Sequence, residues 1–271
     1  MANLSPEFVA EYRRNVWDKP DWKWRVSNLY RCKPKKGGEP FDFRPNPLQK
    51  RLYDDMWYRN VILKGRGMGS TTGVMVLALD LCYSIPSFSC AIVAHTQDKA
   101  TEIFQDHIRF MHDSCEYPIK RELRADTYGS KSDLQFDNGS RLAVYVTMAG
   151  GSHQCFIWTE AGVQSALDPE GAKNVKMQGL PTARDDAARI FIESTGQGGP
   201  QGVFYDTCMA AREETAMIQS KKIKWSQRSY RFHFFPWFED PNKVRASEYP
   251  ITKEDAEYFK KIERTLSMTL D

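Results

Sequence analysis

Short apolar runs alternate with longer segments of helical periodicity in the middle of the chain. The run NVILK (60–64) is rich in β-branched residues and precedes a glycine cluster, and residues 70–85 then carry apolar side chains at helical spacing. CAIVAH (90–95) predicts a second buried strand, and residues 98–114 predict an amphipathic helix. Strands that alternate with helices of this length indicate crossover connections and a parallel sheet.

The second half of the chain continues this pattern. SDLQF and RLAVYV flank the turn residues 137–140 and predict an antiparallel hairpin, because Asn-Gly is a favoured two-residue turn. Further strands are predicted at 154–158, 189–194 and 229–237, and further helices at 203–218 and 252–266. The predicted fold class is therefore α/β, with a mainly parallel central sheet flanked by helices and an added antiparallel hairpin.

Composition excludes several classes of protein. The chain has 271 residues, of which 41% are hydrophobic and 27% charged, so it is neither disordered throughout nor fibrous. The net charge of +3 is too small to require a nucleic-acid partner and does not exclude one. Its apolar runs contain charges or fall short of the ~20 residues that cross a membrane, and the N-terminus has charges where a secretory signal is apolar.

The cysteines are scattered singly, and no CxxC pair occurs. This spacing predicts neither a zinc site nor a disulfide framework. We therefore expect the cysteines to be core residues. We also expect the protein to be in a reducing compartment, the cytoplasm. The six are Cys32, Cys82, Cys90, Cys115, Cys155 and Cys208.

The segment LKGRGMGSTT (63–72) lies between a predicted strand and a predicted helix. Gly65, Gly67 and Gly69 allow backbone N–H groups to curl around an anion, and the helix that begins near Ser70 adds the positive end of its dipole. This context predicts a phosphate-binding loop, although a glycine-rich turn without a ligand is the alternative.

The loop departs from the P-loop pattern GxxxxGK[ST]. Aligned on its second glycine, Ser70 stands where the lysine belongs and Thr71 fills the Ser/Thr position that ligates Mg²⁺, followed by the hydroxyl of Thr72. The cationic charge that the phosphates need would come from Lys64 at the strand end and from Arg66 in the loop.

Two later strands end in residues that suit ATP hydrolysis. CFIWTE resembles a Walker B strand, in which Glu160 would be the general base and Thr159, in place of aspartate, could hold a metal-bound water. IFIEST ends in Ser194 and Thr195, whose hydroxyls could sense the γ-phosphate. Upstream, the amide of Gln49 could read adenine. Polar strand ends and an exposed glutamine are the alternatives.

The order of these motifs resembles a known family. NPLQ, VILKGRGMGSTT, AIVAHTQDKATEIF, FIWTEAG, IFIESTGQGG and FHFFPWFEDP follow one another as in the ATPase half of a tailed-bacteriophage large terminase subunit. The resemblance covers residues 44–241, and its more specific parts are the IEST block with its glycines and the FFPWFEDP block. It implies a three-layer P-loop NTPase fold of the ASCE type, with ATP and Mg²⁺ as cofactors.

The resemblance also implies roles for individual residues. Lys64 matches a displaced Walker A lysine, Arg66 a loop arginine that engages the γ-phosphate, and Glu160 the catalytic glutamate. Metal contacts fall to Thr71 and, through water, to Thr159. Ser194 and Thr195 match the coupling motif. The implied ATP-binding set is Gln49, Lys64, Gly65, Arg66, Gly67, Met68, Gly69, Ser70, Thr71 and Thr72.

By this resemblance the chain would be a motor that translocates double-stranded DNA into a capsid. Its partners would be DNA, a portal protein and a small terminase subunit. It would act as a homo-oligomeric ring on the capsid and could be a monomer in isolation. Its location would be the host cytoplasm, without contact with a membrane. Since Ser70 and Thr159 depart from the family pattern, a catalytically weakened ATP-binding assembly protein is an alternative. Another ASCE translocase or helicase is a third reading.

Composition and the resemblance together give three expected parts of the chain. These are a basic and aromatic extension (1–40), a P-loop ATPase domain (41–245) and a helical connector (246–271) towards a nuclease domain. No acidic constellation follows, so we expect no nuclease activity in this chain. DNA contacts should go mainly to phosphates, for which the runs 221–224 and 120–121 are candidates, a solvated basic surface being the alternative.

Overall fold

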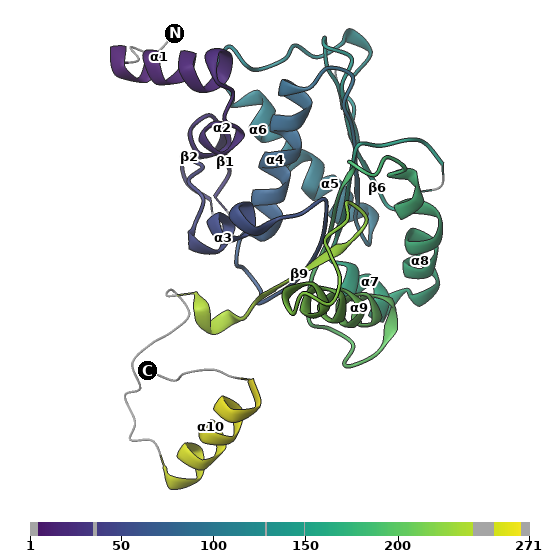
Figure 1. Cartoon of the computed structure of the whole chain (residues 1–271). Coiled ribbons are helices and arrows are strands. Elements are labelled where there is room, and N and C mark those ends of the chain that lie inside the picture. The colour runs from purple at the N-terminus through teal and green to yellow at the C-terminus, as the bar shows by residue number, and fades with distance from the viewer. Residues whose placement is uncertain (1–4, 35–36, 128, 149, 241–251, 267–271) are drawn as a thin grey trace. The chain divides into compact units, whose positions relative to one another are not determined.

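The computed structural model describes residues 5–34, 37–127, 129–148, 150–240 and 252–266 (Figure 1). The chain forms two compact units, 1–237 and 238–271. The second contains the amphipathic helix α10 (Lys253–Leu266), where the periodicity predicts a helix. None of the helices in the described residues has the length and apolar character that a membrane crossing requires.

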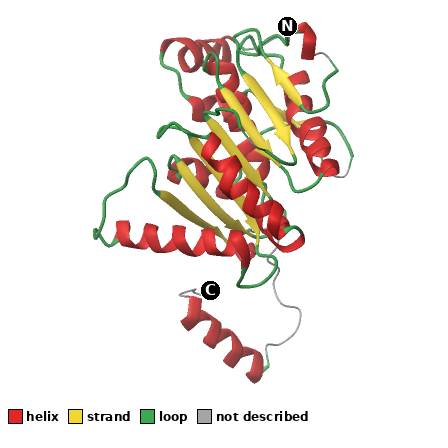
Figure 2. Cartoon of the chain, turned by 90° about the vertical axis from the view of Figure 1, so that its right-hand side faces the viewer, coloured by secondary structure: helices red, strands yellow, loops and turns green. Residues whose placement is uncertain are grey.

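A seven-stranded sheet forms the centre of the first unit (Figure 2). Its strands are β3 (Arg59–Lys64), β4 (Ser89–Val93), β5 (Asp133–Gln135), β6 (Arg141–Tyr145), β7 (Cys155–Thr159), β8 (Arg189–Thr195) and β9 (Tyr230–Phe235). Their order is β5-β6-β4-β7-β8-β3-β9, and within the described residues β5 alone runs antiparallel to its neighbour in this sheet. The α/β class and the mainly parallel sheet are confirmed.

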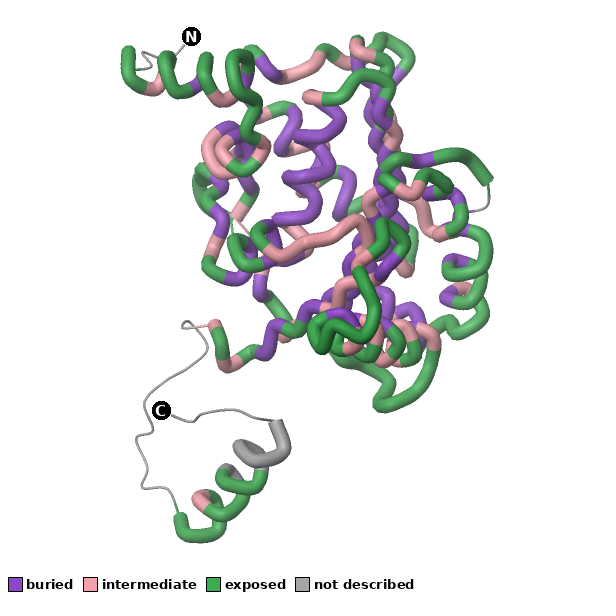
Figure 3. Tube along the Cα trace, viewed as in Figure 1, coloured by how far each residue is buried: buried purple, intermediate pink, exposed green. Residues whose placement is uncertain are grey.

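Helices cover both faces of the sheet. The α-helices of the first unit are α1 (Pro6–Arg13), α2 (Trp22–Asn28), α3 (Pro47–Asp55), α4 (Ser70–Ser84), α5 (Gln97–Glu102), α6 (Phe110–Asp113), α7 (Ala161–Leu167), α8 (Pro169–Asn174) and α9 (Gly202–Gln219), with a π-helical stretch (Ile103–Arg109) between α5 and α6. One core joins the sheet to α2–α6, and a second joins it to α7–α9. Figure 3 shows that α4 is buried along most of its length, whereas α8 and α9 have exposed outer sides.

The strands are apolar on both sides because the sheet lies between these two cores. In β4, Cys90 and Ile92 belong to the core around α4, while Ala91 and Val93 belong to the core around α9. Both faces of a parallel sheet are covered by its crossover helices, so its strands read as continuous apolar runs. This explains why short runs, rather than alternating patterns, marked these strands in the sequence.

The predicted hairpin is also present. β5 and β6 pair antiparallel around Asn138 and Gly139, and the Phe136 N–H donates to the Ser140 carbonyl at 2.9 Å. Gly139 has a φ of +82°, which a residue with a side chain rarely adopts. Outside the main sheet, β1 (Arg31–Cys32) and β2 (Phe41–Asp42) form a second antiparallel pair.

The six cysteines are core residues, as their apolar surroundings predict. All six are buried and free of disulfide bonds. Burial raises the pKa of the Cys32 thiol to about 12, because water no longer stabilises its thiolate. These thiols therefore serve packing rather than chemistry.

The N-terminal segment, which is α2 with the residues up to Tyr30, packs onto α4. Val26 and Leu29 are fully buried in the core that surrounds this helix. Arg25 Nη2 lies 2.7 Å from Asp80 Oδ2 on α4, and Tyr30 donates its hydroxyl to Asp80 Oδ1 at 2.9 Å. The basic side chain of Arg25 is therefore used for a buried ion pair within the fold.

Two buried histidines should make the folded protein less stable in mild acid. Burial lowers the pKa of His112 to about 4 and that of His233 to about 3, and each ring is hydrogen-bonded, to Tyr83 and to Asn60 respectively. Below about pH 6.5 the two histidines bind protons in the unfolded chain but not in the folded chain. Their contribution to the free energy of unfolding is therefore fully present above pH 6.5, and it is lost progressively as the pH falls towards 4 and 3.

We therefore expect the free energy of unfolding to be about 2 kcal/mol lower at pH 5.5 than at pH 7, since each such histidine contributes up to about 1.4 kcal/mol per pH unit. Urea unfolding at the two pH values measures this difference. The control is a folded variant in which both histidines are replaced by glutamine, for which the difference should shrink. An equal difference in the variant would contradict the assignment to His112 and His233.

Candidate nucleotide-binding site

The loop that joins β3 to α4 forms an open backbone cradle. Gly67 and Gly69 have φ values of +74° and +76°, in the left-handed region that glycine adopts without strain. Gly69 caps the N-terminus of α4, whose first N–H groups have no partner within the helix. At Gly65 a Cβ atom would lie 2.9 Å from the Cα of Trp237, so only glycine fits. The loop and the N-terminus of the 15-residue helix together suit an anion.

Two side chains at the start of α3 support this cradle from below. Gln49 Nε2 donates to the Gly69 carbonyl at 2.7 Å, and Asn46 Nδ2 donates to the Met68 carbonyl at 3.1 Å. Gln49 Oε1 also accepts from the backbone N–H of Asn46, which completes a capping box. The amide of Gln49 is thus used to hold the loop, and adenine recognition by Gln49 stays a prediction that requires the amide to change partners.

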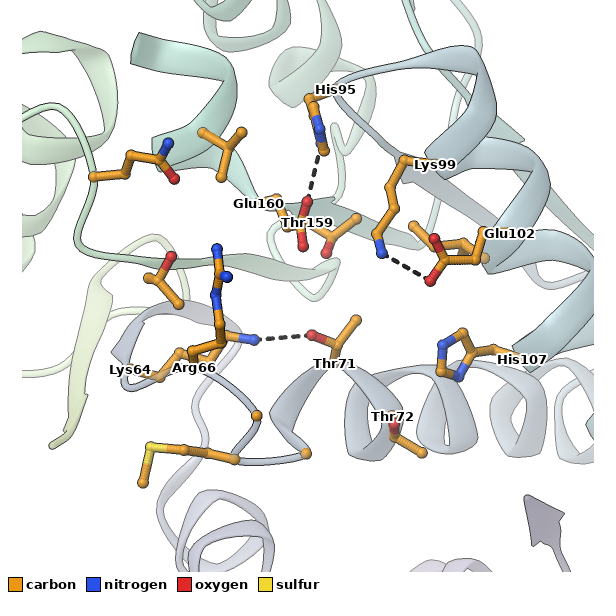
Figure 4. A pocket seen from close by; sticks show the side chains of 17 residues that line it. Lys64, Arg66, Thr71, Thr72, His95, Lys99, Glu102, His107, Thr159 and Glu160 are labelled. Atoms are coloured by element: carbon orange, nitrogen blue, oxygen red, sulfur yellow. Dashed lines mark hydrogen bonds and ion pairs between the residues drawn. The ribbon is translucent and has the colours of Figure 1, made fainter. Parts of the chain in front are cut away.

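A cavity of about 490 Å³ opens above the loop at the carboxyl ends of β3, β4, β7 and β8 (Figure 4). Ligands of parallel sheets bind at this edge, and the volume lies within the ~300–1,000 Å³ typical of small-molecule sites. Its walls come from the loop, from these four strand ends, from α7 and from α5 with its π-helical extension. They are lined by Lys64, Arg66, Gly67, Met68, Gly69, Thr71, Thr72, His95, Lys99, Glu102, Ile103, His107, Thr159, Glu160, Val163, Thr195 and Gln197.

A connected polar cluster joins the loop to the neighbouring strands. Lys64 Nζ lies 2.5 Å from Glu193 Oε2 and donates to Thr71 Oγ1 at 2.9 Å. Glu193 Oε1 accepts hydrogen bonds from Thr71 Oγ1 at 2.8 Å and from Thr159 Oγ1 at 2.5 Å. Complete burial works to raise the pKa of Glu193, but the charge of Lys64 and these hydrogen bonds outweigh it and hold the pKa below its ordinary value. The carboxylate is therefore ionised and paired.

Glu160 stands at the end of β7 in a strained backbone conformation. Its φ of +54° is rare for a residue with a side chain and costs about 1–3 kcal/mol, a cost that is common at functional sites. The side chain lines the cavity, and Oε2 lies 3.1 Å from His95 Nδ1 (Figure 4). Arg66 extends from the loop towards the strand ends that carry Thr159 and Glu160 (Figure 4). The carboxylate and the cradle therefore face the same cavity.

Most residues proposed from the sequence meet in this cavity, and four lie behind its surface. Those that line it are Lys64, Arg66, Gly67, Met68, Gly69, Thr71, Thr72, Thr159, Glu160 and Thr195. Those that do not are Gln49, Gly65, Ser70 and Ser194. The hydroxyls of Ser70 and Ser194 are buried and have no hydrogen-bond partner within the described part of the chain. Ser194 lies against Gly162, where a Cβ would come within 2.9 Å of its oxygen.

Several residues of the site were not predicted from the sequence, and Glu193 and His95 are the two that contact predicted site residues. Glu193 directly follows the apolar run 190–192 within β8, and a charged residue at such a position is itself a signal, because burying a charge is costly. His95 follows β4 at the same sheet edge as Glu160. The rule that ligands bind beyond the carboxyl ends of parallel strands could have identified it.

The oxygen atoms of the cluster fit a magnesium ion better than a transition metal. The described residues contain no group of three or more His, Cys, Asp or Glu side chains that could hold a metal ion. Thr71 and Thr159 instead offer two hydroxyls, each hydrogen-bonded to the Glu193 carboxylate. Mg²⁺ is commonly held by one or two carboxylates together with water and substrate phosphates.

The basic runs considered for DNA binding lie elsewhere. Residues 221–224 are exposed just after α9. Lys120 and Arg121 are half-buried, and Arg121 Nε donates to the Tyr83 carbonyl at 3.0 Å. None of these residues lines the cavity, and their contact with DNA stays a prediction.

Comparison with known proteins gives matches to solved structures only. No protein-family model matches the chain, and no curated protein sequence matches it. The large terminase ATPase domain of Thermus phage P74-26 matches with a TM-score of 0.55 and 16% identity, covering 82% of this chain and 88% of that domain. The large terminase of bacteriophage HK97 matches with a TM-score of 0.54 and 15% identity, covering 90% of this chain and 52% of that protein.

This chain therefore spans about half the length of the HK97 terminase. At such low identity the likeness concerns the fold, and it agrees with the motif order that pointed to the same family. A mainly parallel sheet flanked by helices is the architecture that the chain shares with these ATPase structures. The chain has the fold of the ATPase domain of phage large terminases.

Proposed function

We propose that this chain is the ATP-hydrolysing motor domain of a viral DNA-packaging terminase, which couples ATP hydrolysis to the translocation of double-stranded DNA into a capsid. The observation that carries the proposal is that the backbone cradle and Glu160 face each other across one cavity. An anion site opposite a carboxylate is what ATP hydrolysis needs, since one part holds the phosphates and the other activates water. The terminase fold supports the choice among ATPases.

The residues would divide the chemistry as follows. The loop amides and the N-terminus of α4 bind the triphosphate, and Lys64 and Arg66 stabilise charge on the γ-phosphate. Glu160 orients a water molecule for in-line attack and accepts its proton, while His95 holds the carboxylate in place. Mg²⁺ bound with ATP would neutralise phosphate charge, with Thr71 as its ligand and Thr159 acting through water.

Loss of the γ-phosphate would be sensed at the end of β8. Thr195 lines the cavity and pairs with Lys64 of β3, and Ser194 is buried directly behind it. Strand β8 also pairs with β7, which leads to Glu160. A shift at Thr195 is therefore transmitted to both elements that hold the phosphates, and from there to a DNA-gripping surface.

The proposed partners follow from packaging. DNA would be held mainly through its phosphates, because a translocase must accept every sequence. A portal protein and a small terminase subunit would dock the domain, as a homo-oligomeric ring, on a procapsid in the host cytoplasm. The likeness of the fold to two phage large terminases supports this assignment.

A titration with an ATP analogue tests the site through two neighbouring substitutions. Lys64→Ala should weaken binding by about 10–100-fold, because a hydrogen bond to a charged group contributes about 1.5–3 kcal/mol. Ser70→Ala is the matched control and should change affinity less than about twofold, because Ser70 is buried and does not line the cavity, so a hydrogen bond to the analogue is not lost. Both variants must first show wild-type circular dichroism. A larger loss of affinity in Ser70→Ala than in Lys64→Ala would mean that Lys64 is not the residue whose charge binds the phosphates.

A phosphate-release assay with and without DNA separates the proposal from its alternatives. Turnover by the wild type supports a motor. Nucleotide binding without turnover, in the presence of DNA and capsids, would favour a catalytically weakened assembly protein. Turnover that DNA stimulates but that portal-bearing capsids leave unchanged would favour another translocase or a helicase.

A further inference from the structure

The end of β7 lacks the carboxylate that a nucleotide-bound magnesium ion usually has beside a P-loop. In P-loop NTPases the ion is held by the Ser or Thr hydroxyl of the loop and by an aspartate on a neighbouring strand. Here Thr159 occupies the strand end and carries no charge. The negative charge must therefore come from another residue near Thr71.

Glu193 brings a carboxylate to this point from the adjacent strand. Strand β8 pairs directly with β7, and Glu193 is in register with Thr159. One carboxylate oxygen accepts hydrogen bonds from both Thr71 Oγ1, at 2.8 Å, and Thr159 Oγ1, at 2.5 Å. A carboxylate that holds a metal-ligating group in this way fixes the orientation of that group and strengthens metal binding.

A cation already lies against the same carboxylate and the same Thr71 hydroxyl. The ammonium of Lys64 is 2.5 Å from Glu193 Oε2 and 2.9 Å from Thr71 Oγ1, so it takes the place that a metal ion would need. Glu193 is fully buried, and a buried carboxylate is costly unless a positive charge compensates it. If Lys64 moves to the phosphates of ATP, Glu193 needs another cation.

We propose that Glu193 is the carboxylate that holds Mg²⁺ in this site, in place of the aspartate that is absent at position 159. This assignment rests on the proposed function. With ATP bound, Lys64 contacts the phosphates, and Glu193 compensates the charge of the metal while it orients the Thr71 hydroxyl. Glu160 remains free to act on water, so the two carboxylates have separate tasks.

The test measures how much Mg²⁺ tightens the binding of a non-hydrolysable ATP analogue, by titration calorimetry with Mg²⁺ and with EDTA. In the wild type and in Glu160→Gln the metal should tighten binding at least about tenfold, and in Glu193→Gln this gain should be lost. Binding of Mn²⁺ in the presence of ADP, followed by electron paramagnetic resonance, should weaken about 10–100-fold in Glu193→Gln. Adding Thr159→Asp to Glu193→Gln returns a carboxylate to the cluster and should restore the gain.

The outcomes distinguish this assignment from the proposed function. Absence of analogue binding by the folded wild type would overturn the proposed function and the assignment with it. Analogue binding with an undiminished metal gain in folded Glu193→Gln would overturn the assignment of Glu193 alone. If Glu193→Gln does not fold, Glu193→Asp decides, because it keeps a buried charge opposite Lys64 but draws the carboxylate back from Thr71. A smaller metal gain in Glu193→Asp supports the assignment, and an undiminished gain overturns it.

Discussion

Replacement of Glu160 by glutamine is expected to lower ATP turnover by about 10²–10⁴-fold, while the affinity for ATP stays within about twofold of the wild type. Glutamine keeps the size and the hydrogen-bonding reach of the side chain but cannot accept a proton from water. The phosphates are held by the loop on the other side of the cavity, so their binding does not depend on this carboxylate. Phosphate release and analogue titration measure the two quantities separately.

A second acid in the same cavity provides the control. Glu102 lines the cavity from α5 and is paired with Lys99 at 2.8 Å. Glu102→Gln removes one negative charge from the same space, so it should reproduce any general electrostatic effect but leave turnover within about threefold, since surface ion pairs contribute little. If both variants lost turnover equally, or if Glu160→Gln kept it, Glu160 would not be the general base.

The backbone at Glu160 adds a structural argument for this role. The left-handed conformation costs stability, and Gly162 two residues later leaves room for Ser194 and for the Thr195 carbonyl, which would both lie 2.9 Å from a Cβ there. The turn after β7 is therefore shaped by close contacts with β8. The left-handed conformation places the carboxylate at the cavity, where His95 contacts it.

Much of this fold could be predicted because local patterns determine it. The buried strands β3, β4 and β8 are apolar on both faces, and α4 and α9 have helical periodicity, so each element appears directly in the sequence. The order of strands in the sheet could not be derived, since pairing between β3 and β8, far apart in the sequence, depends on tertiary contacts.

The site, too, could be predicted from the sequence only in part. Glycines 65, 67 and 69 and Glu160 were found because strand ends and loops obey a general rule about the edge of a parallel sheet. Spacing alone does not give the direction of the side chains at the start of α4, where Ser70 is buried while Thr71 lines the cavity. Nor could spacing show that the amide of Gln49 is used by the backbone of the loop.

The attachment of the N-terminal segment depends on one buried ion pair, and breaking it should cost about 3–5 kcal/mol of unfolding free energy. Asp80→Asn leaves the guanidinium of Arg25 buried without a compensating charge, and Arg25 donates three hydrogen bonds to this carboxylate at 2.7–3.2 Å. Tyr30 also loses the charged acceptor of its hydroxyl. Urea unfolding measures the loss.

An exposed pair between neighbouring elements is the matched control. Lys23, also on α2, contacts Asp54 of α3 at 2.6 Å, but the two side chains are 47% and 67% exposed. Asp54→Asn should therefore cost less than about 1 kcal/mol, because water and side-chain entropy offset an exposed pair. Arg25→Met combined with Asp80→Leu and Tyr30→Phe should recover most of the loss, because neither an unpaired charge nor an unpaired buried hydroxyl remains. A loss in Asp80→Asn no larger than that in Asp54→Asn would mean that apolar contacts of residues such as Val26 and Leu29, and not the ion pair, hold the segment on α4.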